Sequence, residues 1–221
     1  MQILAPFIDH TLLKPDATAR EIEQLCAEAR QHGFHSVCVN SSRVALAHSL
    51  IVDSPVVVAS VVGFPLGAMD SDAKRYETEL AVDLGAEEID VVINIGKLKD
   101  ADDKFVLREL RDVVEAANDR VVKVILETCL LTREEIIRGC HLVLDSGAKF
   151  VKTSTGCSKS GATVEGVQLL REIVGRDFGV KAAGGIRDRA TAEAMITAGA
   201  TRLGTSAGVA IVTDGTGTAV Y

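Results

Sequence analysis

Apolar and polar residues alternate in blocks from one end of the chain to the other, and the blocks have two kinds of spacing. Residues 56–62 and 121–126 are almost continuous runs of apolar, mostly β-branched residues. Such runs are typical of parallel strands that are covered on both faces. The segments between the runs have the spacing of amphipathic helices.

This pattern predicts eight strands, near residues 6–11, 35–39, 56–62, 88–94, 121–127, 149–154, 179–183 and 201–205. Helices are expected near residues 18–32, 41–52, 70–85, 98–117, 132–146, 163–175 and 188–198, with room for a short one after Ser206. Two helix starts carry a capping signal, because Thr18 and Thr132 each precede a glutamate by three residues. Glycines follow several helices, as is usual where the chain turns left-handed (Gly33, Gly85, Gly147 and Gly199).

Eight strands that alternate with helices predict an α/β fold of the (β/α)₈ (TIM) barrel type, near the lower end of its size range. The competing architecture is an open doubly wound sheet, which should carry a glycine fingerprint after its first strand. The turn at residues 9–15 contains no glycine. We therefore expect one catalytic barrel domain over residues 1–221, with a flexible Gly/Thr-rich tail from about residue 213.

Composition narrows the class of protein further. Hydrophobic residues make up 47% of the chain and charged residues 25%, which is ordinary for a soluble globular protein. The net charge is −7, there is no tryptophan, and the basic residues form no block, so nucleic acid is not an expected partner. No apolar run is long enough to span a membrane, and the first residues do not resemble a signal peptide. A cytoplasmic location is the default expectation.

Cysteines and histidines give no sign of a metal site. The five cysteines are widely spaced and form no C-x-x-C motif, so they are expected to be reduced thiols (Cys26, Cys38, Cys129, Cys140 and Cys157). The five histidines show no ligand spacing either. Cys38 is interpreted as a small buried residue at a strand end rather than a nucleophile, since His35 should face the other way.

Two lysines in apolar strands are the main candidates for chemistry. Lys152 and Lys181 lie on neighbouring predicted strands, each just before a glycine-bearing turn. Burial disfavours a charged ammonium group, and two lysines close together should lower each other's pKa further. A neutral lysine amine is a nucleophile that forms Schiff bases with carbonyl compounds. The simpler alternative is a lysine that reaches solvent at the barrel rim.

Asp90 lies between apolar residues in another predicted strand and needs a charged partner there. It is interpreted as an acid/base group that works with Lys181, and the alternative is a simple buried ion pair. Other polar residues are expected at strand ends without an assigned role: Asp9, Asn40, Asn94, Lys123, Glu127 and Thr205.

Three glycine-bearing turns follow the last three predicted strands, at residues 153–156, 184–187 and 204–208. Exposed backbone N–H groups in such turns bind phosphate. Each turn alone could be a geometric requirement of a strand-to-helix connection. Arg187 could contact the same phosphate or simply lie on the following helix.

Seven segments together resemble the deoxyribose-phosphate aldolase family, and the resemblance covers essentially the whole chain. They are residues 8–15, 62–67, 88–92, 123–128, 150–156, 180–187 and 202–206. The resemblance implies a class I aldolase without cofactor or metal that reversibly cleaves 2-deoxy-D-ribose 5-phosphate into glyceraldehyde 3-phosphate and acetaldehyde. It also implies a homo-oligomer, a dimer or a tetramer.

The resemblance assigns roles residue by residue. Lys152 would form the Schiff base, Lys181 would lower its pKa, and Asp90 would move protons through water. Thr11, Cys38, Phe64 and Thr155 would line the sugar pocket, and Gly156, Gly184, Gly185 and Ser206 would hold the phosphate. Tyr221 would relay protons from a mobile tail, or be an incidental aromatic residue in that tail.

Two departures from the family pattern concern the phosphate. Many members have a second serine where this chain has Ala207, and some have a lysine where it has Cys157. Both departures would weaken a preference for phosphorylated over free deoxyribose. The functional alternatives are another phosphate-binding barrel lyase or isomerase, and a barrel that only binds a phosphorylated ligand. The last leaves the buried lysines and Asp90 without a purpose.

Overall fold

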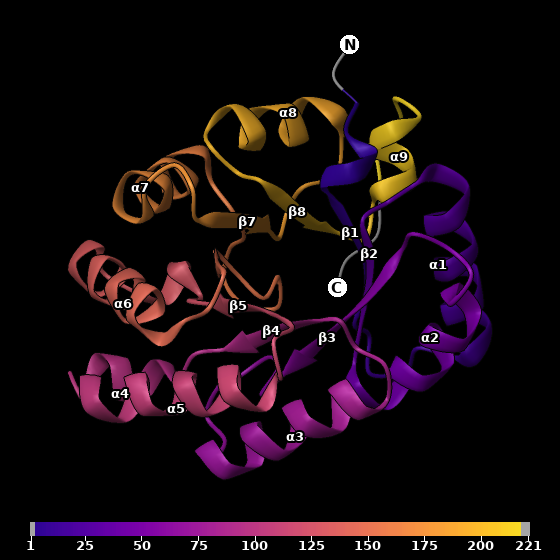
Figure 1. Cartoon of the computed structure of the whole chain (residues 1–221). Helices are drawn as coiled ribbons and strands as arrows, with labels where there is room; N and C mark the ends of the chain where they lie inside the picture. The colour runs from indigo at the N-terminus through magenta and orange to yellow at the C-terminus, as the bar shows by residue number, and fades with distance from the viewer. Residues whose placement is uncertain (1–2, 218–221) are drawn as a thin grey trace.

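Eight parallel strands close into a barrel in the computed structural model, which describes residues 3–217 (Figure 1). The strands are β1 (Ile8–Leu12), β2 (Ser36–Val39), β3 (Val57–Val62), β4 (Glu88–Val92), β5 (Val121–Ile125), β6 (Phe150–Lys152), β7 (Gly179–Ala183) and β8 (Arg202–Thr205). Each strand pairs with the next in sequence, and β8 pairs with β1. The predicted (β/α)₈ barrel is therefore confirmed, and the open sheet is excluded.

Helices form a ring outside the strands (Figure 1). They are α1 (Ala19–His32), α2 (Val44–Ile51), α3 (Ser71–Asp83), α4 (Ile95–Lys99), α5 (Asp103–Ala116), α6 (Arg133–Ser146), α7 (Val164–Val174), α8 (Arg189–Thr197) and α9 (Gly208–Val212). Short 3₁₀ turns occur at Ala5–Phe7, Ser41–Arg43 and Thr128–Leu130. No helix within residues 3–217 is long and apolar enough to cross a membrane.

One expected helix is divided in two. The single helix predicted over residues 98–117 is wrong, because α4 ends at Lys99 and α5 begins at Asp103. Ala101 takes a left-handed conformation with φ 57°, which ends the first helix. The Asp102 side chain then accepts a hydrogen bond from the Phe105 N–H and caps the second.

The predicted helix caps are present. Thr18 and Glu21 form a reciprocal capping box at the start of α1, and Thr132 and Glu135 form another at α6. Gly33 and Gly147 end those two helices with φ of 68° and 92°. These local signals fix where each helix enters and leaves the ring, and thereby where each strand begins.

The two faces of each strand have different chemistry. Ile89 and Val91 on β4 point outward into the apolar layer beneath the helices, whereas Asp90 between them is buried on the other face. Val151 on β6 likewise lies in the outer layer next to Lys152. Side chains alternate along a strand, so the apolar layer directs the charged residues into the barrel.

A buried ion pair joins two of the outer helices. Lys74 on α3 donates to Glu109 on α5 at 2.8 Å and to the Val92 carbonyl at the end of β4 at 2.9 Å. Neither charged side chain is exposed to solvent. Burial lowers the pKa of Lys74 and raises the pKa of Glu109. Both side chains therefore stay charged only because each one balances the buried charge of the other.

Removing one partner of this pair is expected to destabilise the protein strongly. In Lys74→Met, Glu109 stays buried without its cation, and the free energy of unfolding should fall by about 3–5 kcal/mol. The double variant Lys74→Met/Glu109→Leu should recover most of that loss, since it removes both buried charges. Urea denaturation measures both effects.

The half-exposed Lys97–Asp102 pair provides the control, and Lys97→Met should cost less than ~1 kcal/mol. A double variant no more stable than Lys74→Met would show that packing, rather than the lost charge partner, causes the destabilisation.

Candidate active site

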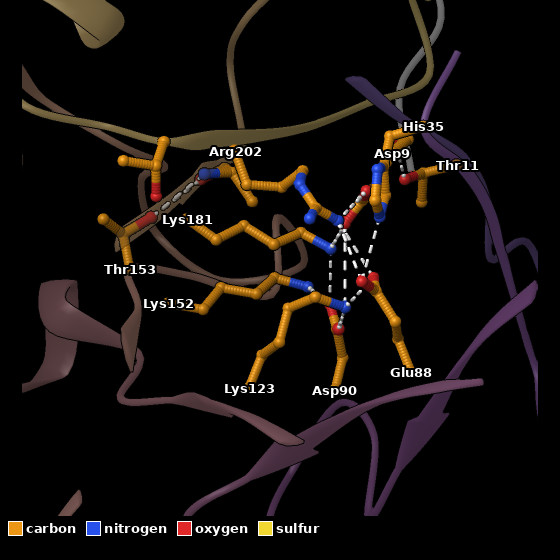
Figure 2. Close-up of polar contacts among 12 residues, drawn as sticks. Asp9, Thr11, His35, Glu88, Asp90, Lys123, Lys152, Thr153, Lys181 and Arg202 are labelled. Carbon is orange, nitrogen blue, oxygen red and sulfur yellow. Dashed lines mark hydrogen bonds and ion pairs between the residues drawn. The ribbon is translucent and has the colours of Figure 1, made fainter. Parts of the chain in front are cut away.

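Seven charged side chains meet inside the barrel and form what we term the interior charge cluster (Figure 2). Its members are Asp9 on β1, Glu88 and Asp90 on β4, Lys123 on β5, Lys152 on β6, Lys181 on β7 and Arg202 on β8. All are buried. The barrel register aligns Asp90 with Lys123 and Lys152 with Lys181, which brings their side chains to one level. Figure 2 shows the three lysines reaching toward Asp90.

Asp90 is the centre of the cluster. Its Oδ2 lies 2.6 Å from the Nζ of Lys152 and 2.6 Å from the Nζ of Lys181. Its Oδ1 accepts a hydrogen bond from Lys123 at 2.7 Å. Burial raises the pKa of Asp90, but the three lysines outweigh burial and hold it well below its usual value. The expected charged partners of Asp90 are thus present, together with Lys123, which had no assigned role.

Lys181 is held in its charged form, which corrects one expectation. Its ammonium contacts Asp9 as well as Asp90. Burial lowers the pKa of Lys181, but these two carboxylates more than offset burial and raise it above the usual lysine value. The prediction that the two lysines depress each other was therefore wrong for Lys181, because Asp9 reaches it across the barrel closure.

Lys152 has the opposite balance. Burial lowers its pKa, and the charge of Lys181 lowers it further. Asp90 counteracts this only in part, because Lys152 shares that carboxylate with two other amines. Two amines therefore contact the same oxygen of Asp90: Lys152, whose pKa is lowered, and Lys181, which keeps its charge. The alternative interpretation, in which Lys152 reaches solvent at the barrel rim, is excluded because its side chain is only 4% exposed.

The charge count of the cluster explains this asymmetry. Three carboxylates are balanced by three cations that keep their protons: Asp9, Glu88 and Asp90 by Lys123, Lys181 and Arg202. A proton on Lys152 would add a fourth positive charge without a fourth carboxylate. A net charge in a buried site is costly, so Lys152 is the group that gives up its proton.

The base of the cluster is closed by ion pairs. Arg202 lies 2.9 Å from Asp9 and 2.9 Å from Glu88, and Glu88 lies 2.7 Å from Lys123. Burial raises the pKa of Glu88, but Lys123 and a 3.0 Å hydrogen bond with His35 outweigh burial and bring it to about 2. Glu88 therefore remains charged and holds Lys123 in its charged form.

One trio within residues 3–217 has the residue types of a metal site, but its ligand atoms are already engaged by other groups. Asp9, His35 and Glu88 place ligand atoms within 4.8 Å of one another. Both carboxylates are already engaged by cationic side chains, and the His35 nitrogen is bound to Glu88. A metal ion would have to displace those cations, so the trio does not fit one.

An apolar wall faces the charged half of the barrel. Cys38, Ala59, Val61 and Leu13 form a small separate cluster, against which Phe64 packs. Thr11 pairs with Cys38 in the β1–β2 register and is also buried. Burial, followed by the nearby Asp90, raises the pKa of the Cys38 thiol, so it stays protonated. The structure thus brings together Thr11, Cys38 and Phe64, whose role as a sugar pocket stays a prediction.

The glycine turns after β6 and β7 are in backbone contact. Gly156 and Gly184 have φ of 87° and 88°, and Gly185 has φ of 80°. A Cβ on Gly184 would lie 2.8 Å from the Gly161 Cα and 3.3 Å from the Gly156 Cα, so no larger residue fits there. Gly185 has open space where its Cβ would be. A phosphate could approach that backbone.

The turn after β8 joins the other two. The Thr205 hydroxyl donates to the Ile186 carbonyl at 2.7 Å, which ties the end of β8 to the turn after β7. Ser206 follows at the rim, and Arg187 is exposed nearby. Phosphate binding by these turns stays a prediction. Tyr221 lies outside the described residues, so its predicted proton relay stays a prediction as well.

Sequence reasoning placed Asp9 and Lys123 at strand ends without a role, and it overlooked Glu88 and Arg202. Asp9, Glu88, Lys123 and Arg202 were not chosen as site residues, although each lies in or beside an apolar strand. Asp90 was selected because it is a charged residue between apolar residues of a predicted strand. The same is true of Lys123, which has valines on both sides. If every charged residue inside a predicted strand had been taken as inward-facing, all four residues would have been found.

Comparisons with known proteins agree with this architecture. The chain matches a family model described as "DeoC/LacD family aldolase" over residues 3–214. It is 57% identical over 212 residues to a deoxyribose-phosphate aldolase from Alkaliphilus oremlandii (strain OhILAs), covering 96% of each chain. It is 54% identical to another from Geobacillus sp. (strain WCH70), covering 99% of this chain and 98% of the relative.

A solved structure gives the same result. A deoxyribose phosphate aldolase from Aeropyrum pernix, described as tetrameric, superposes with a TM-score of 0.89 at 34% identity. The superposition covers 95% of this chain and 89% of that one. With a family model that matches nearly the whole sequence and close relatives along its full length, the chain belongs to the DeoC/LacD family of aldolases.

Proposed function

We propose that this protein is a class I aldolase that reversibly cleaves 2-deoxy-D-ribose 5-phosphate into D-glyceraldehyde 3-phosphate and acetaldehyde. One observation carries the proposal: a lysine amine of depressed pKa and a charged lysine share a single carboxylate oxygen. A neutral amine supplies the nucleophile for a Schiff base, and the charged neighbour supplies a proton. The relatives named deoxyribose-phosphate aldolase support the choice of substrate.

The first half of the proposed reaction forms the imine. The neutral Nζ of Lys152 attacks the C1 aldehyde carbon of the open-chain sugar and gives a carbinolamine. Lys181 is the nearest group held in its cationic form, and it protonates the departing hydroxyl, which leaves as water. The product is a protonated imine that attracts electrons from the adjacent carbon. Asp90 holds both lysines within reach of the reacting atoms.

The second half breaks the carbon chain. A water molecule next to Asp90 takes the proton from the C3 hydroxyl, which turns C3 into an aldehyde as the C2–C3 bond breaks. The bonding electrons move to C2 and the imine, which releases glyceraldehyde 3-phosphate and leaves an enamine on Lys152. Protonation of the enamine at C2, with Asp90, Lys181 and water as the relay, and hydrolysis of the imine then release acetaldehyde.

The surroundings of the cluster suit the two ends of this substrate. The apolar wall with Cys38 and Phe64 would contact the carbon end that becomes acetaldehyde. Thr11 and Thr155 would complete the sugar pocket. The backbone of Gly156, Gly184 and Gly185, with Ser206, would hold the phosphate. Ala207 offers no hydroxyl there, so one contact available to a serine is absent.

The remaining parts of the proposal concern cofactors and partners. We propose that catalysis needs no metal and no cofactor, because Lys152 itself carries the covalent intermediate. The partner is a small sugar phosphate, without nucleic acid or membrane. We further propose a homo-oligomer in the cytoplasm, for which the tetrameric Aeropyrum pernix relative is the supporting observation.

A direct assay tests this function. The protein is incubated with 2-deoxy-D-ribose 5-phosphate, and glyceraldehyde 3-phosphate and acetaldehyde are measured as they form. Both products should appear in equal amounts, at a rate that EDTA does not change. The competing function is a sugar-phosphate isomerase on the same barrel. Isomerisation of ribose 5-phosphate without cleavage of deoxyribose 5-phosphate would favour that alternative and contradict the aldolase.

A further inference from the structure

Glu127 lies at the mouth of the barrel, two residues after the end of β5, and its backbone is strained. It has φ 57° and ψ 59°, in the left-handed region that L-residues with side chains rarely adopt. Among residues 3–217, four other non-glycine residues have positive φ, and all four are exposed. Glu127 is only 2% exposed. Strain of this kind persists where the surroundings require it, and it often marks a functional position.

The strained backbone directs the Glu127 carboxylate to the loop that follows β6. Its Oε2 accepts hydrogen bonds from the Thr155 hydroxyl and from the Thr155 N–H, the latter at 3.3 Å. The Thr155 hydroxyl oxygen in turn accepts a hydrogen bond from the Cys157 N–H at 3.0 Å. One carboxylate thus holds, through one hydroxyl, the residues on both sides of Gly156.

A cavity borders these hydrogen bonds. It has a volume of about 130 Å³, and its lining includes Glu127, Thr155 and Cys157 together with the apolar residues Leu130 and Ile95. The loop therefore borders open space on this side. Its shape depends on the contacts with Glu127, on the bond between the Thr128 N–H and the Thr153 carbonyl at 2.9 Å, and on bonds from the Thr153 hydroxyl and the Ala162 N–H to Ala183.

The loop held in this way is the one whose backbone is proposed to bind phosphate. Gly156 lies beside Gly184, since a Cβ on Gly184 would lie 3.3 Å from the Gly156 Cα, so the position of Gly156 also affects the turn after β7. A carboxylate is the wrong charge for direct contact with a phosphate. Because both contacts of its Oε2 are to Thr155, Glu127 can act on the phosphate end only by shaping the loop.

We propose that Glu127 is a positioning residue that sets the phosphate end of the substrate site through Thr155. It thereby determines how strongly the enzyme prefers phosphorylated over free deoxyribose. The inference rests on the proposed function, since it concerns the same substrate. It assigns Thr155 a second task beyond lining the pocket, because the hydroxyl links the carboxylate to the loop backbone.

Substrate preference in Glu127→Ala tests the proposal. The ratio of kcat/KM for 2-deoxyribose 5-phosphate to that for free 2-deoxyribose should fall about tenfold to hundredfold, as expected for losing one or two charge-assisted hydrogen bonds. The change should come from KM for the phosphorylated sugar. Glu127→Gln keeps an acceptor oxygen for Thr155 and should retain most of the ratio. Thr155→Val should resemble Glu127→Ala.

Trapping of acetaldehyde on Lys152 distinguishes a positioning role of Glu127 from general damage to the active site. Acetaldehyde carries no phosphate, so its reductive trapping on Lys152 by borohydride should proceed at the wild-type rate in Glu127→Ala and Glu127→Gln. Cys129→Ser is the matched control, because the Cys129 thiol contacts the other oxygen of Glu127 at 3.7 Å and not the loop. It should leave the ratio unchanged. Thermal unfolding of each variant confirms that it is folded.

Several outcomes would overturn the inference. One is an unchanged ratio in Glu127→Ala and Thr155→Val, and another is a ratio that falls as far in Glu127→Gln as in Glu127→Ala. In either case wild-type cleavage and trapping would still support the aldolase. A wild-type protein that traps no acetaldehyde and cleaves no deoxyribose 5-phosphate would instead contradict the proposed function, and the inference with it.

Discussion

Lys152→Met is expected to remove aldolase activity while leaving the protein folded. Without the amine no imine forms, and kcat should fall by at least about 10⁴-fold, as after removal of a covalent nucleophile in other enzymes. The barrel should survive, because Asp90 keeps its contacts with Lys123 and Lys181. The substitution also removes a buried amine whose desolvation is unfavourable. Steady-state cleavage of deoxyribose 5-phosphate and urea denaturation measure the two effects.

The covalent product identifies the reacting lysine. Wild-type protein treated with acetaldehyde and borohydride should carry one reduced two-carbon adduct, and peptide mapping should locate it at Lys152. Lys149→Met is the control, because Lys149 is an exposed lysine on the same segment and should not affect the adduct. Activity that persists in Lys152→Met, or an adduct on another lysine of the barrel, would contradict the assignment.

Lys181→Met is expected to alter both the height and the pH dependence of activity. The neutral form of Lys152 is the nucleophile, so activity rises with pH through the Lys152 pKa. The charge of Lys181 lowers that pKa, and removing it must therefore raise the pKa. The ascending limb should move to higher pH, and activity near pH 7 should fall as less Lys152 is neutral. Loss of the proton donor should lower the plateau by about 10²–10⁴-fold.

Lys123→Met is the comparison that shows whether the position of the lost charge determines the pKa of Lys152. Lys123 binds the other oxygen of Asp90 and is held by Glu88, so its charge lies on the far side of that carboxylate. Its removal should displace the ascending limb less than the removal of Lys181. A pH profile that is unchanged in Lys181→Met, or that moves equally in both variants, would contradict the proposed division between the two lysines.

Much of the architecture could be predicted because the information was local. The β-branched runs at residues 56–62 and 121–126 define strands regardless of the rest of the chain. Strand alternation was enough to place Lys152 and Asp90 inside the barrel, since Val151, Ile89 and Val91 had to face the helices. The break between α4 and α5 was missed because the Asp102 cap lies inside the range that was expected to be one helix.

The charge states could not be predicted, because they depend on distant contacts. Lys181 is held in its charged form by Asp9, which is 172 positions away in the sequence and adjacent only because β8 closes on β1. Nothing in the sequence indicates that these two residues are neighbours in the fold. Glu127 was expected at a strand end but received no role for a similar reason, since its contact with Thr155 requires a left-handed backbone that residue type does not predict.

The pH dependence of imine formation at Lys152 tests the central claim most directly. The rate of reductive trapping of acetaldehyde can be followed at this residue by mass spectrometry from about pH 6 to about pH 11, a range that includes the ordinary lysine pKa. The charge balance of the barrel lowers the Lys152 pKa and predicts that trapping reaches half its maximum below the ordinary lysine value of 10.5. Trapping that rises only near 10.5, or an adduct at Lys181 instead, would contradict it.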